Sequence, residues 1–439
     1  MRVAFALWPA PAHLYPFVPL AWALRNAGHE VVFVSHPDLA ETVAASGLPF
    51  ASMYGEAEAP PPQGPAADFP AAREEMFRIN QMLPIPKEDK LAWDTVSYGF
   101  LPSMWEFCPF QASPEDPMPA MDGMVTFFRR WKPDLVIWDP CMPGAAVAAR
   151  AAGARQARQS GTDYNGWYLD TFSRLTSGPD APDLPNPFAE TVRGMAEKYG
   201  VNVDHDILYG EWTIDVMPKG MNYSVDTLRL PMRWIPYSEQ VAMPNWLYPV
   251  PERPRVALSL GLSVRTYLKT GWGWLEALME ALSGLDIEVI ATLDESQLAA
   301  VSTVPGNVRV VDYLPLDYLL PTCSALIHHG GLGTMAPAGQ AGVPQLVVDL
   351  PEREDGTSHG YFRYKLAPIT GRYVTSLGAG EVMDLGQPSI PAIRDQITRV
   401  IADPAFAVGA ARLRTDMLAA PSPSDLVPTL EKLTFAGHR

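Results

Sequence analysis

Short apolar runs alternate with amphipathic segments from the start of the chain. This pattern predicts a buried strand at 2–8, a helix at 16–27 that ends at Gly28, and a second strand at 30–34. A strand, a helix and a strand within about 35 residues form a βαβ unit, which indicates a parallel sheet. A further strand at 134–138, followed by a helix of small residues at 144–152, extends the same pattern.

The pattern restarts after a proline-rich stretch at 231–254, whose composition is typical of an interdomain linker. Beyond this stretch the predicted elements are strands 255–260, 286–291, 308–311, 324–328 and 345–348, a helix at 274–283, and a helical tail within 421–433. The chain is therefore predicted to contain two α/β domains.

Two segments, 55–120 and 161–190, are rich in proline and aromatic residues and keep neither a strand period nor a helix period for long. They are either ordinary packed loops and short helices or an aromatic wall for a flat, apolar ligand. The candidate contacts of such a ligand are Trp93, Phe100, Trp105 and Trp167.

Composition narrows the classes of partner. The 439 residues carry a net charge of −16, which argues against binding nucleic acid or docking electrostatically on an anionic membrane. No apolar run reaches the roughly 20 residues of a membrane span, and the N-terminal apolar run is too short for a signal peptide. Three widely separated cysteines cannot form a full disulfide framework. A reduced, cytoplasmic protein without a metal site is expected.

The clearest chemical signal is the sequence HHGGLGT at 328–334, between an apolar strand and a predicted helix. Glycines allow a ligand to approach the backbone closely, and a helix N-terminus directs N–H groups and a positive dipole at an anion. This predicts a diphosphate cradle without lysine. Its candidate residues are His328, His329, Gly330, Gly331, Gly333 and Thr334.

Other interpretations of this turn are weaker. It is not a Walker loop, because no Lys-Ser/Thr follows the glycines. Gly331, Gly333 and Ala336 approach the dinucleotide-binding fingerprint, but they lie deep in the second domain rather than in a first βα turn. Adjacent histidines rarely direct their side chains to one metal, and no third ligand stands at the usual spacing. A purely structural turn remains an alternative.

HHGGLGT followed by AGQAGVPQLVV resembles the nucleotide-binding signature of family 1 glycosyltransferases. The blocks VPLAWALRNAGHEV, GEWTIDVMP, IATLDESQL, LLPTCSALIHHGG and RLRTDMLAAPSPSDLV resemble the actinobacterial enzymes that attach deoxysugars to macrolide and anthracycline aglycones. The resemblance implies the α/β GT-B fold, with two Rossmann-like domains facing a central cleft and a C-terminal helix returning to the N-terminal domain. The implied parts are an acceptor domain at 1–230, the linker 231–254, a nucleotide-sugar domain at 255–415 and a helical tail at 416–439.

The resemblance also assigns roles to individual residues. His13 stands at the position of the general base, and Asp139, at the end of a strand, at that of the carboxylate which orients it. From the residues alone, His13 could equally be a packed or capping histidine, and Asp139 a carboxylate that caps the next helix. Tyr313 is expected to stack on the nucleobase, with backbone groups of Tyr313 and Leu314 bonding it.

Ser263 is expected near the phosphates. Asp355-Gly356 stands where many relatives have an Asp-Gln pair for sugar hydroxyls, and the loss of the amide suits a deoxysugar. The segment 356–376 is longer than usual for the family, which leaves open whether it remodels the sugar pocket or contacts a partner.

Together these features predict inverting transfer of a deoxysugar from a TDP-sugar to a hydrophobic polyketide aglycone, with no metal or other cofactor. The resemblance is also compatible with a homodimer and with an auxiliary partner that resembles a cytochrome P450 without its haem cysteine. It leaves open whether the bond formed is O- or C-glycosidic. The alternatives are a catalytically weak homologue that acts as a scaffold or activator, and a GT-B sugar epimerase.

Overall fold

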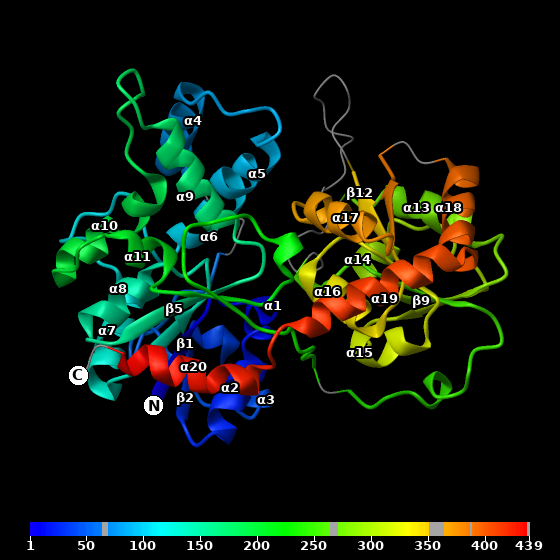
Figure 1. Cartoon of the computed structure of the whole chain (residues 1–439), viewed down its shortest axis with the longest axis horizontal. Coiled ribbons are helices and arrows are strands. Elements are labelled where there is room, and N and C mark those ends of the chain that lie inside the picture. Colours follow the sequence, from blue (N-terminus) through cyan, green and yellow to red (C-terminus); the bar gives the residue numbers. More distant parts are fainter. Residues whose placement is uncertain (64–68, 240, 264–270, 351–363, 387–388, 437–439) are drawn as a thin grey trace. The chain divides into compact units, whose positions relative to one another are not determined.

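The computed structural model describes residues 1–63, 69–239, 241–263, 271–350, 364–386 and 389–436. The chain forms two compact units, one comprising residues 1–235 with 421–439 and the other residues 236–420 (Figure 1). Each unit is built on its own parallel β-sheet with helices on both faces, so the predicted α/β class with two Rossmann-like domains is confirmed.

The first unit contains a seven-stranded parallel sheet in the order β3-β2-β1-β4-β5-β6-β7. Its central strands β1 and β4 are almost entirely apolar and buried, as expected for a parallel sheet that is covered on both faces. The strands are β1 Arg2–Ala6, β2 Glu30–Ser35, β3 Phe50–Ser52, β4 Leu135–Trp138, β5 Arg155–Ser160, β6 Thr213–Asp215 and β7 Arg229–Pro231.

Helices of the first unit cover the sheet and extend beyond it (Figure 1). They are α1 Pro11–Leu14, α2 Val18–Asn26, α3 Ala40–Ala45, α4 Pro70–Met82, α5 Lys90–Thr95, α6 Leu101–Trp105, α7 Pro119–Trp131, α8 Gly144–Ala151, α9 Tyr164–Leu175, α10 Pro187–Tyr199 and α11 His205–Tyr209. A π-helical turn, Val96–Phe100, joins α5 to α6.

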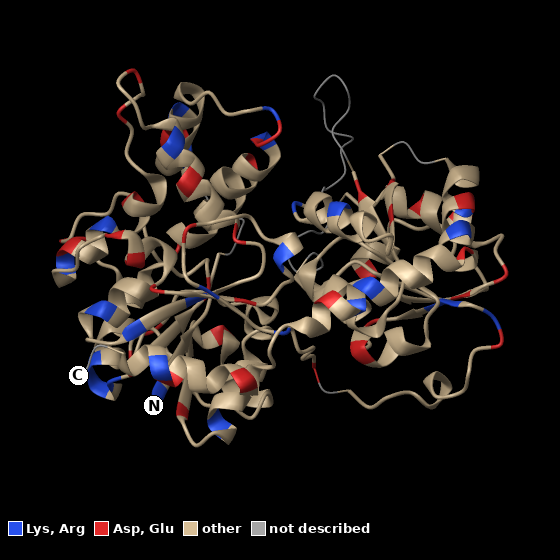
Figure 2. Ribbon diagram, in the orientation of Figure 1, with Lys and Arg blue, Asp and Glu red and all other residues tan. Residues whose placement is uncertain are grey.

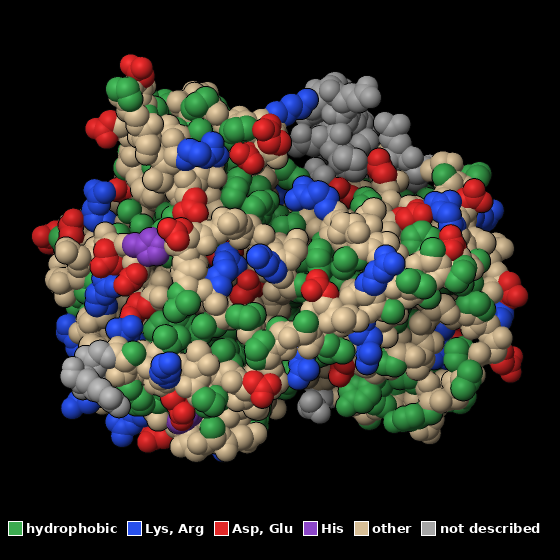
Figure 3. All heavy atoms as spheres, in the orientation of Figure 1, with side chains coloured by type: hydrophobic (Ala, Val, Ile, Leu, Met, Phe, Trp, Pro, Cys, Tyr) green, Lys and Arg blue, Asp and Glu red, His purple; other side chains and the backbone are tan. Residues whose placement is uncertain are grey.

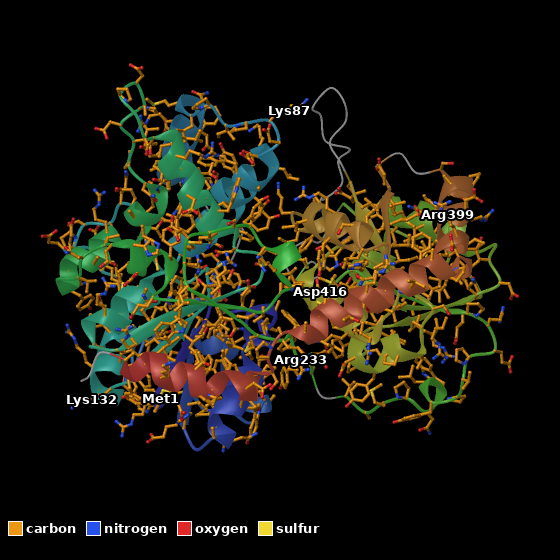
Figure 4. The ribbon with its side chains drawn as sticks, viewed as in Figure 1. Met1, Lys87, Lys132, Arg233, Arg399 and Asp416 are labelled. Atoms are coloured by element: carbon orange, nitrogen blue, oxygen red, sulfur yellow. The ribbon has the colours of Figure 1, made fainter. Side chains whose placement is uncertain are left out.

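The last helix of the chain, α20 Pro423–Phe435, belongs to the first unit and packs against α2. Its Glu431 carboxylate lies 3.0 Å from His29 Nε2, and the ammonium group of Met1 lies 3.0 Å from the other ring nitrogen of His29. Figure 4 shows Met1 beside this helix. These contacts confirm the predicted return of the C-terminal helix to the N-terminal domain.

The second unit contains a six-stranded parallel sheet in the order β10-β9-β8-β11-β12-β13. Its strands are β8 Arg255–Ser259, β9 Glu288–Thr292, β10 Val308–Val311, β11 Ala325–His328, β12 Gln345–Asp349 and β13 Gly380–Asp384. Its helices are α13 Trp274–Leu282, α14 Glu295–Leu298, α15 Leu316–Leu319, α16 Leu332–Ala341, α17 Ala367–Ser376, α18 Ile390–Ala402 and α19 Pro404–Ala419. Buried aliphatic side chains of β8, β9, α13 and α18 form its main core.

The direction of strand order reverses once in each sheet, between β1 and β4 in the first and between β8 and β11 in the second. In open parallel sheets, ligands bind beyond the carboxyl ends of the strands at such a reversal, because the loops on the two sides diverge there. His13 lies on the short helix α1 that follows β1, and Asp139 directly follows β4. The glycine turn directly follows β11. The predicted chemistry of both units therefore lies at these two positions.

Charged groups are dispersed over each unit rather than segregated by sign. Figure 2 shows Lys and Arg interspersed with Asp and Glu on both units. Figure 3 shows basic, acidic and apolar side chains next to one another on the face in view. None of the described helices is both long enough and apolar enough to cross a membrane.

Candidate active site

A histidine and a carboxylate meet at the strand reversal of the first sheet. His13 lies on α1, just after β1, and its Nδ1 is 2.5 Å from Asp139 Oδ2. The Asp139 side chain is 2% exposed and that of His13 is 34% exposed. With Nδ1–H donating to the carboxylate, the neutral imidazole carries its lone pair on Nε2. Nε2 makes no hydrogen bond to the residues described, so this nitrogen can accept a proton.

Two backbone hydrogen bonds hold Asp139 in place beside the His13 imidazole. The Asp139 N–H donates to Ala6 O of β1 at 3.0 Å, which extends the pairing of β1 and β4 by one residue. Asp139 Oδ1 accepts from the Cys141 N–H at 2.7 Å, leaving Oδ2 for His13. The side chain therefore closes the turn after β4 and contacts the His13 ring. It does not cap the next helix, α8, whose N-cap is Pro143 without a side-chain cap bond, so the capping alternative is wrong.

Burial lowers the pKa of His13, but the charge and hydrogen bond of Asp139 raise it by more, and the net pKa lies above the usual 6.5. A base with a raised pKa binds the proton it removes more strongly. The pair can thus accept a proton at Nε2 and stabilise the imidazolium that results.

Exchanging Asp139 for asparagine is expected to move the acid limb of the pH–rate profile to lower pH. The substitution removes the negative charge that raises the pKa of His13, whereas burial, which lowers this pKa, remains. Because the base acts when deprotonated, its working range then extends to more acidic pH, although kcat falls through the weaker base. The measurement is kcat/KM between pH 5 and 9; an unshifted acid limb would show that the group titrating is not His13.

Two neighbouring residues support the pair and were not identified from the sequence. The Trp8 ring lies 5.1 Å from the His13 ring, and Trp8 Nε1 donates to Ser103 O at 2.9 Å. Cys141 supplies the N–H that holds Asp139. Neither residue type signals such a role by itself, and the contacts depend on the approach of β1, β4 and α6.

Among the described residues, His13, Asp139 and Cys141 form the group whose ligand atoms could hold a metal ion, all within 4.8 Å of one another. The direct bond between His13 and Asp139 already satisfies Nδ1 and Oδ2 without an ion. The expectation that the reaction needs no metal stays a prediction.

The aromatic prediction is corrected for Trp93 and Trp105. They are 0% and 1% exposed, so neither ring has a surface left for a ligand. Trp93 stacks on Tyr168 with ring centroids 4.1 Å apart and donates to Asn80 Oδ1, while Trp105 donates to Thr191. Both belong to the core formed by helices α4 to α10. A large aromatic ring buries much apolar surface in such a core, so the residue type alone does not distinguish a core residue from a ligand contact.

Phe100 and Trp167 are partly exposed, so each has surface that could contact an acceptor. Their role in acceptor binding stays a prediction. Phe100 belongs to the π-helical turn and packs edge-on against Tyr164, with ring centroids 5.9 Å apart. Trp167 packs on Tyr223 at 5.0 Å, and Tyr223 also contacts Tyr164. These rings form one cluster on α9 and its neighbours. Tyr164 lies in the aromatic segment 161–190 noted in the sequence, whereas Tyr223 was not singled out there.

The glycine turn of the second unit links β11 to α16. Gly331 is the N-cap of this helix, and its carbonyl accepts from the N–H groups of Thr334 and Met335. The N–H groups of Gly331, Leu332 and Gly333 have no hydrogen-bond partner among the described residues. A Cβ on Gly333 would meet no atom within 4 Å, so the space beside the helix N-terminus is open. Free N–H groups at a helix N-terminus are suited to an anion.

The structure corrects the role predicted for the two histidines. Burial lowers the pKa of His328 to about 3 and that of His329 to about 4, so both imidazoles are neutral at pH 7 and add no positive charge. His328 is fully buried, and its Nδ1 accepts from the Gly330 N–H at 3.3 Å. It therefore shapes the turn rather than contacting a ligand. Within the described turn, the positive potential comes from the backbone N–H groups at the start of α16.

His329, which was predicted to contact the diphosphate, is packed into the glycine turn. A Cβ on Gly261 or on Gly331 would lie 2.4 Å from its ring, so these two glycines make room for the imidazole. The Tyr364 ring meets it edge-on at 4.4 Å. Thr334 is likewise buried, in the first turn of α16.

Replacing Gly330 by alanine is expected to destabilise the turn. Gly330 has φ +88°, and a Cβ there would lie 2.6 Å from Ala367 Cα, a backbone atom that cannot move aside easily. Strain and overlap together are expected to cost about 2–4 kcal/mol and to abolish tight anion binding. Gly306→Ala is the matched control, since a Cβ there meets nothing within 4 Å. Urea unfolding compares the two; equal stability would contradict the described turn.

The remaining predicted contacts to the nucleotide and the sugar differ in their exposure. Tyr313 is partly exposed, and its hydroxyl accepts from the Glu239 N–H at 3.0 Å, which fixes the ring. The Leu314 side chain is in the core, so this residue can offer a ligand only its backbone. Ser263 is partly exposed beyond the end of β8. Asp355 and Gly356 lie outside the described residues.

Comparisons with known proteins show to which family the chain belongs. The erythromycin biosynthesis protein CIII-like N-terminal domain matches residues 22–261, and the C-terminal domain of the same kind matches residues 276–433. The chain belongs to the erythromycin biosynthesis protein CIII-like family of glycosyltransferases. The predicted resemblance to actinobacterial deoxysugar transferases is thereby confirmed.

Relatives match along the whole chain. Aclacinomycin-T 2-deoxy-L-fucose transferase of Streptomyces galilaeus is 37% identical over 100% of this chain and 97% of its own. The 10-deoxymethynolide desosaminyltransferase of Streptomyces venezuelae is 36% identical over 100% and 98%. The solved structure of the glycosyltransferase VinC in complex with dTDP is 31% identical, with a TM-score of 0.78 and complete coverage of both chains. The GT-B fold is therefore confirmed.

Proposed function

We propose that this glycosyltransferase moves a deoxysugar from a TDP-sugar to a hydroxyl group of a hydrophobic polyketide aglycone, with inversion at the anomeric carbon. The observation that carries the proposal is the His13–Asp139 pair at the strand reversal of the first sheet. Such a pair can deprotonate the acceptor oxygen as it attacks the anomeric carbon, and no nucleophilic side chain is needed to form an intermediate. A single displacement inverts the configuration.

The second unit supplies what the leaving group needs. As the anomeric bond breaks, negative charge grows on the terminal phosphate of TDP, and the free N–H groups at the start of α16 can stabilise it. Tyr313, held by the Glu239 N–H, offers a ring on which the thymine can stack. Bound dTDP in the VinC structure supports the choice of nucleotide.

The nature of the acceptor follows from the relatives and from the first unit. One relative is named for transfer of 2-deoxy-L-fucose with aclacinomycin T, and the other for transfer of desosamine with 10-deoxymethynolide. Together the relatives support acceptors of the macrolide and anthracycline classes. The partly exposed Phe100, Trp167 and Tyr223, with the buried Tyr164, form a cluster suited to such a molecule. An auxiliary P450-like protein and a homodimer remain further proposals for this chain.

A thermal-shift titration with TDP and UDP tests the donor half of the proposal. A nucleotide that binds only the folded chain raises its melting temperature by mass action, by roughly 5–10 °C at a hundredfold excess over Kd. TDP is expected to give a larger shift than UDP. This shift is expected without any added metal ion. No shift with TDP, or a larger one with UDP, would contradict the proposed donor.

A further inference from the structure

Both backbone polar groups of Gly330 are held by side chains. The Gly330 N–H donates to His328 Nδ1 at 3.3 Å, and its carbonyl accepts from the Thr370 hydroxyl at 2.7 Å. Thr370 and His328 are both fully buried, so these bonds are shielded from water. Two such bonds on one residue leave the peptide that follows Gly330 little freedom to rotate.

This restraint determines the direction of the next N–H group. The Gly330–Gly331 peptide is trans, so the Gly330 carbonyl and the Gly331 N–H point in opposite directions across the same plane. Since the carbonyl points to Thr370 on α17, the Gly331 N–H points away from α17. It joins the Leu332 and Gly333 N–H groups as the first of the unpartnered donors at the start of α16 among the described residues.

Helix α17 is itself anchored, so Thr370 is a fixed point rather than a mobile contact. The Tyr373 hydroxyl donates to Asp416 on α19, whose position is labelled in Figure 4. On another side of the helix, a Cβ on Gly371 would lie 2.6 Å from Val382 of β13, which shows how closely α17 packs on the sheet. Helix α19 also packs against α16. The two helices on either side of the turn thus share one support.

We propose that Thr370 is a positioning residue for sugar transfer: its hydroxyl aims the Gly331 N–H at the terminal phosphate of the departing nucleotide. This inference rests on the proposed function, and it gives a role to part of the segment 356–376, which is longer than usual for the family. The bond acts through orientation, because Thr370 is fully buried and has no surface to offer a ligand. Its contribution grows as negative charge accumulates on the phosphate, so it stabilises the transition state more than the bound donor.

The test compares three variants by calorimetric titration with TDP and by steady-state kinetics. Thr370→Val keeps the shape of the side chain but removes the donor, Thr370→Ser restores a hydroxyl, and Thr375→Val is a matched control on the exposed side of α17. Thr370→Val is expected to weaken TDP binding about three- to tenfold and to lower kcat in addition, since a net hydrogen bond is lost. Thr370→Ser and Thr375→Val are expected to stay within about twofold of the wild type.

Stoichiometry separates orientation from simple destabilisation. A variant that is partly unfolded binds fewer equivalents of TDP with an unchanged Kd, whereas a misdirected N–H raises Kd at one equivalent. An unchanged Kd and kcat for Thr370→Val, in a wild type that binds TDP, would overturn this inference and leave the proposed function standing. Failure of the wild type to bind TDP would overturn both.

Discussion

His13→Ala is expected to lower the rate of sugar transfer by about 10²–10⁴-fold while leaving TDP binding unchanged. The substitution removes the side chain whose Nε2 accepts the acceptor proton, and no other described histidine has a carboxylate partner at this strand reversal. His13 belongs to the first unit, whereas the glycine turn and Tyr313 belong to the second. The loss should therefore appear in kcat and not in the affinity for the nucleotide.

His205→Ala is the matched control for this prediction. His205 also belongs to the first unit and lies 3.4 Å from a carboxylate, that of Asp206, but it is more than half exposed and stacks on Tyr209 far along the chain from β1. Its replacement is expected to leave turnover within about twofold, as for most surface substitutions. Turnover is measured as TDP release together with glycoside formation. If the two histidine variants behave alike, His13 is not the base.

Asp163→Asn is expected to destabilise the first unit by about 3–5 kcal/mol and to lower its melting temperature by roughly 6–20 °C. The Asp163 carboxylate is fully buried and binds two guanidinium groups, at 2.8 Å to Arg158 and at 2.7 Å to Arg229. The Arg158 side chain is only 1% exposed, so removal of the charge leaves a buried cation without its partner. Asparagine preserves the left-handed backbone conformation, φ 51°, and the cap on the Gly166 N–H.

Asp204→Asn is the matched control for the buried pair. Asp204 also caps a helix, through the Ile207 N–H, and also binds an arginine, Arg150 at 2.7 Å. Its side chain is 52% exposed, so the expected loss of stability is below about 1 kcal/mol. Thermal unfolding followed by circular dichroism compares the two. Similar melting temperatures for both variants would contradict the description of Asp163 as the centre of a buried ionic cluster.

The same cluster shows why part of the first sheet could not be predicted. Strand β5 reads Arg-Gln-Ala-Arg-Gln-Ser, which has neither an apolar run nor an alternating pattern, and yet five of its six residues are buried. Several of its polar groups bond to partners far apart in the sequence: Gln159 Nε2 donates to Pro16 O at 2.9 Å, and Gln156 Nε2 donates to Asp206 O at 2.5 Å. Only the tertiary structure brings these partners together. The apolar strands β1, β2, β4 and β8 were predicted because their burial is encoded locally.

The candidate site shows a similar division. The positions of His13 and Asp139 could be predicted, because each follows an apolar strand of a parallel sheet, and family motifs identify both. What the sequence did not indicate is the state of buried groups. His328 and His329 look like phosphate contacts in the motif, but burial makes both neutral. Trp93 and Trp105 look like ligand contacts but fill a helical core. Burial depends on packing from elements distant in the sequence.

The identity and configuration of the product distinguish inverting sugar transfer from its alternatives. The decisive measurement is mass spectrometry of the wild type and His13→Ala after incubation with a TDP-deoxysugar and a panel of macrolide and anthracycline aglycones, with the configuration of the new bond read by NMR. The wild type is expected to form one glycoside of inverted anomeric configuration together with an equal amount of TDP, whereas His13→Ala is expected to form almost none. Retained configuration, or equal amounts of product from the two proteins, would rule out inverting transfer with His13 as the base.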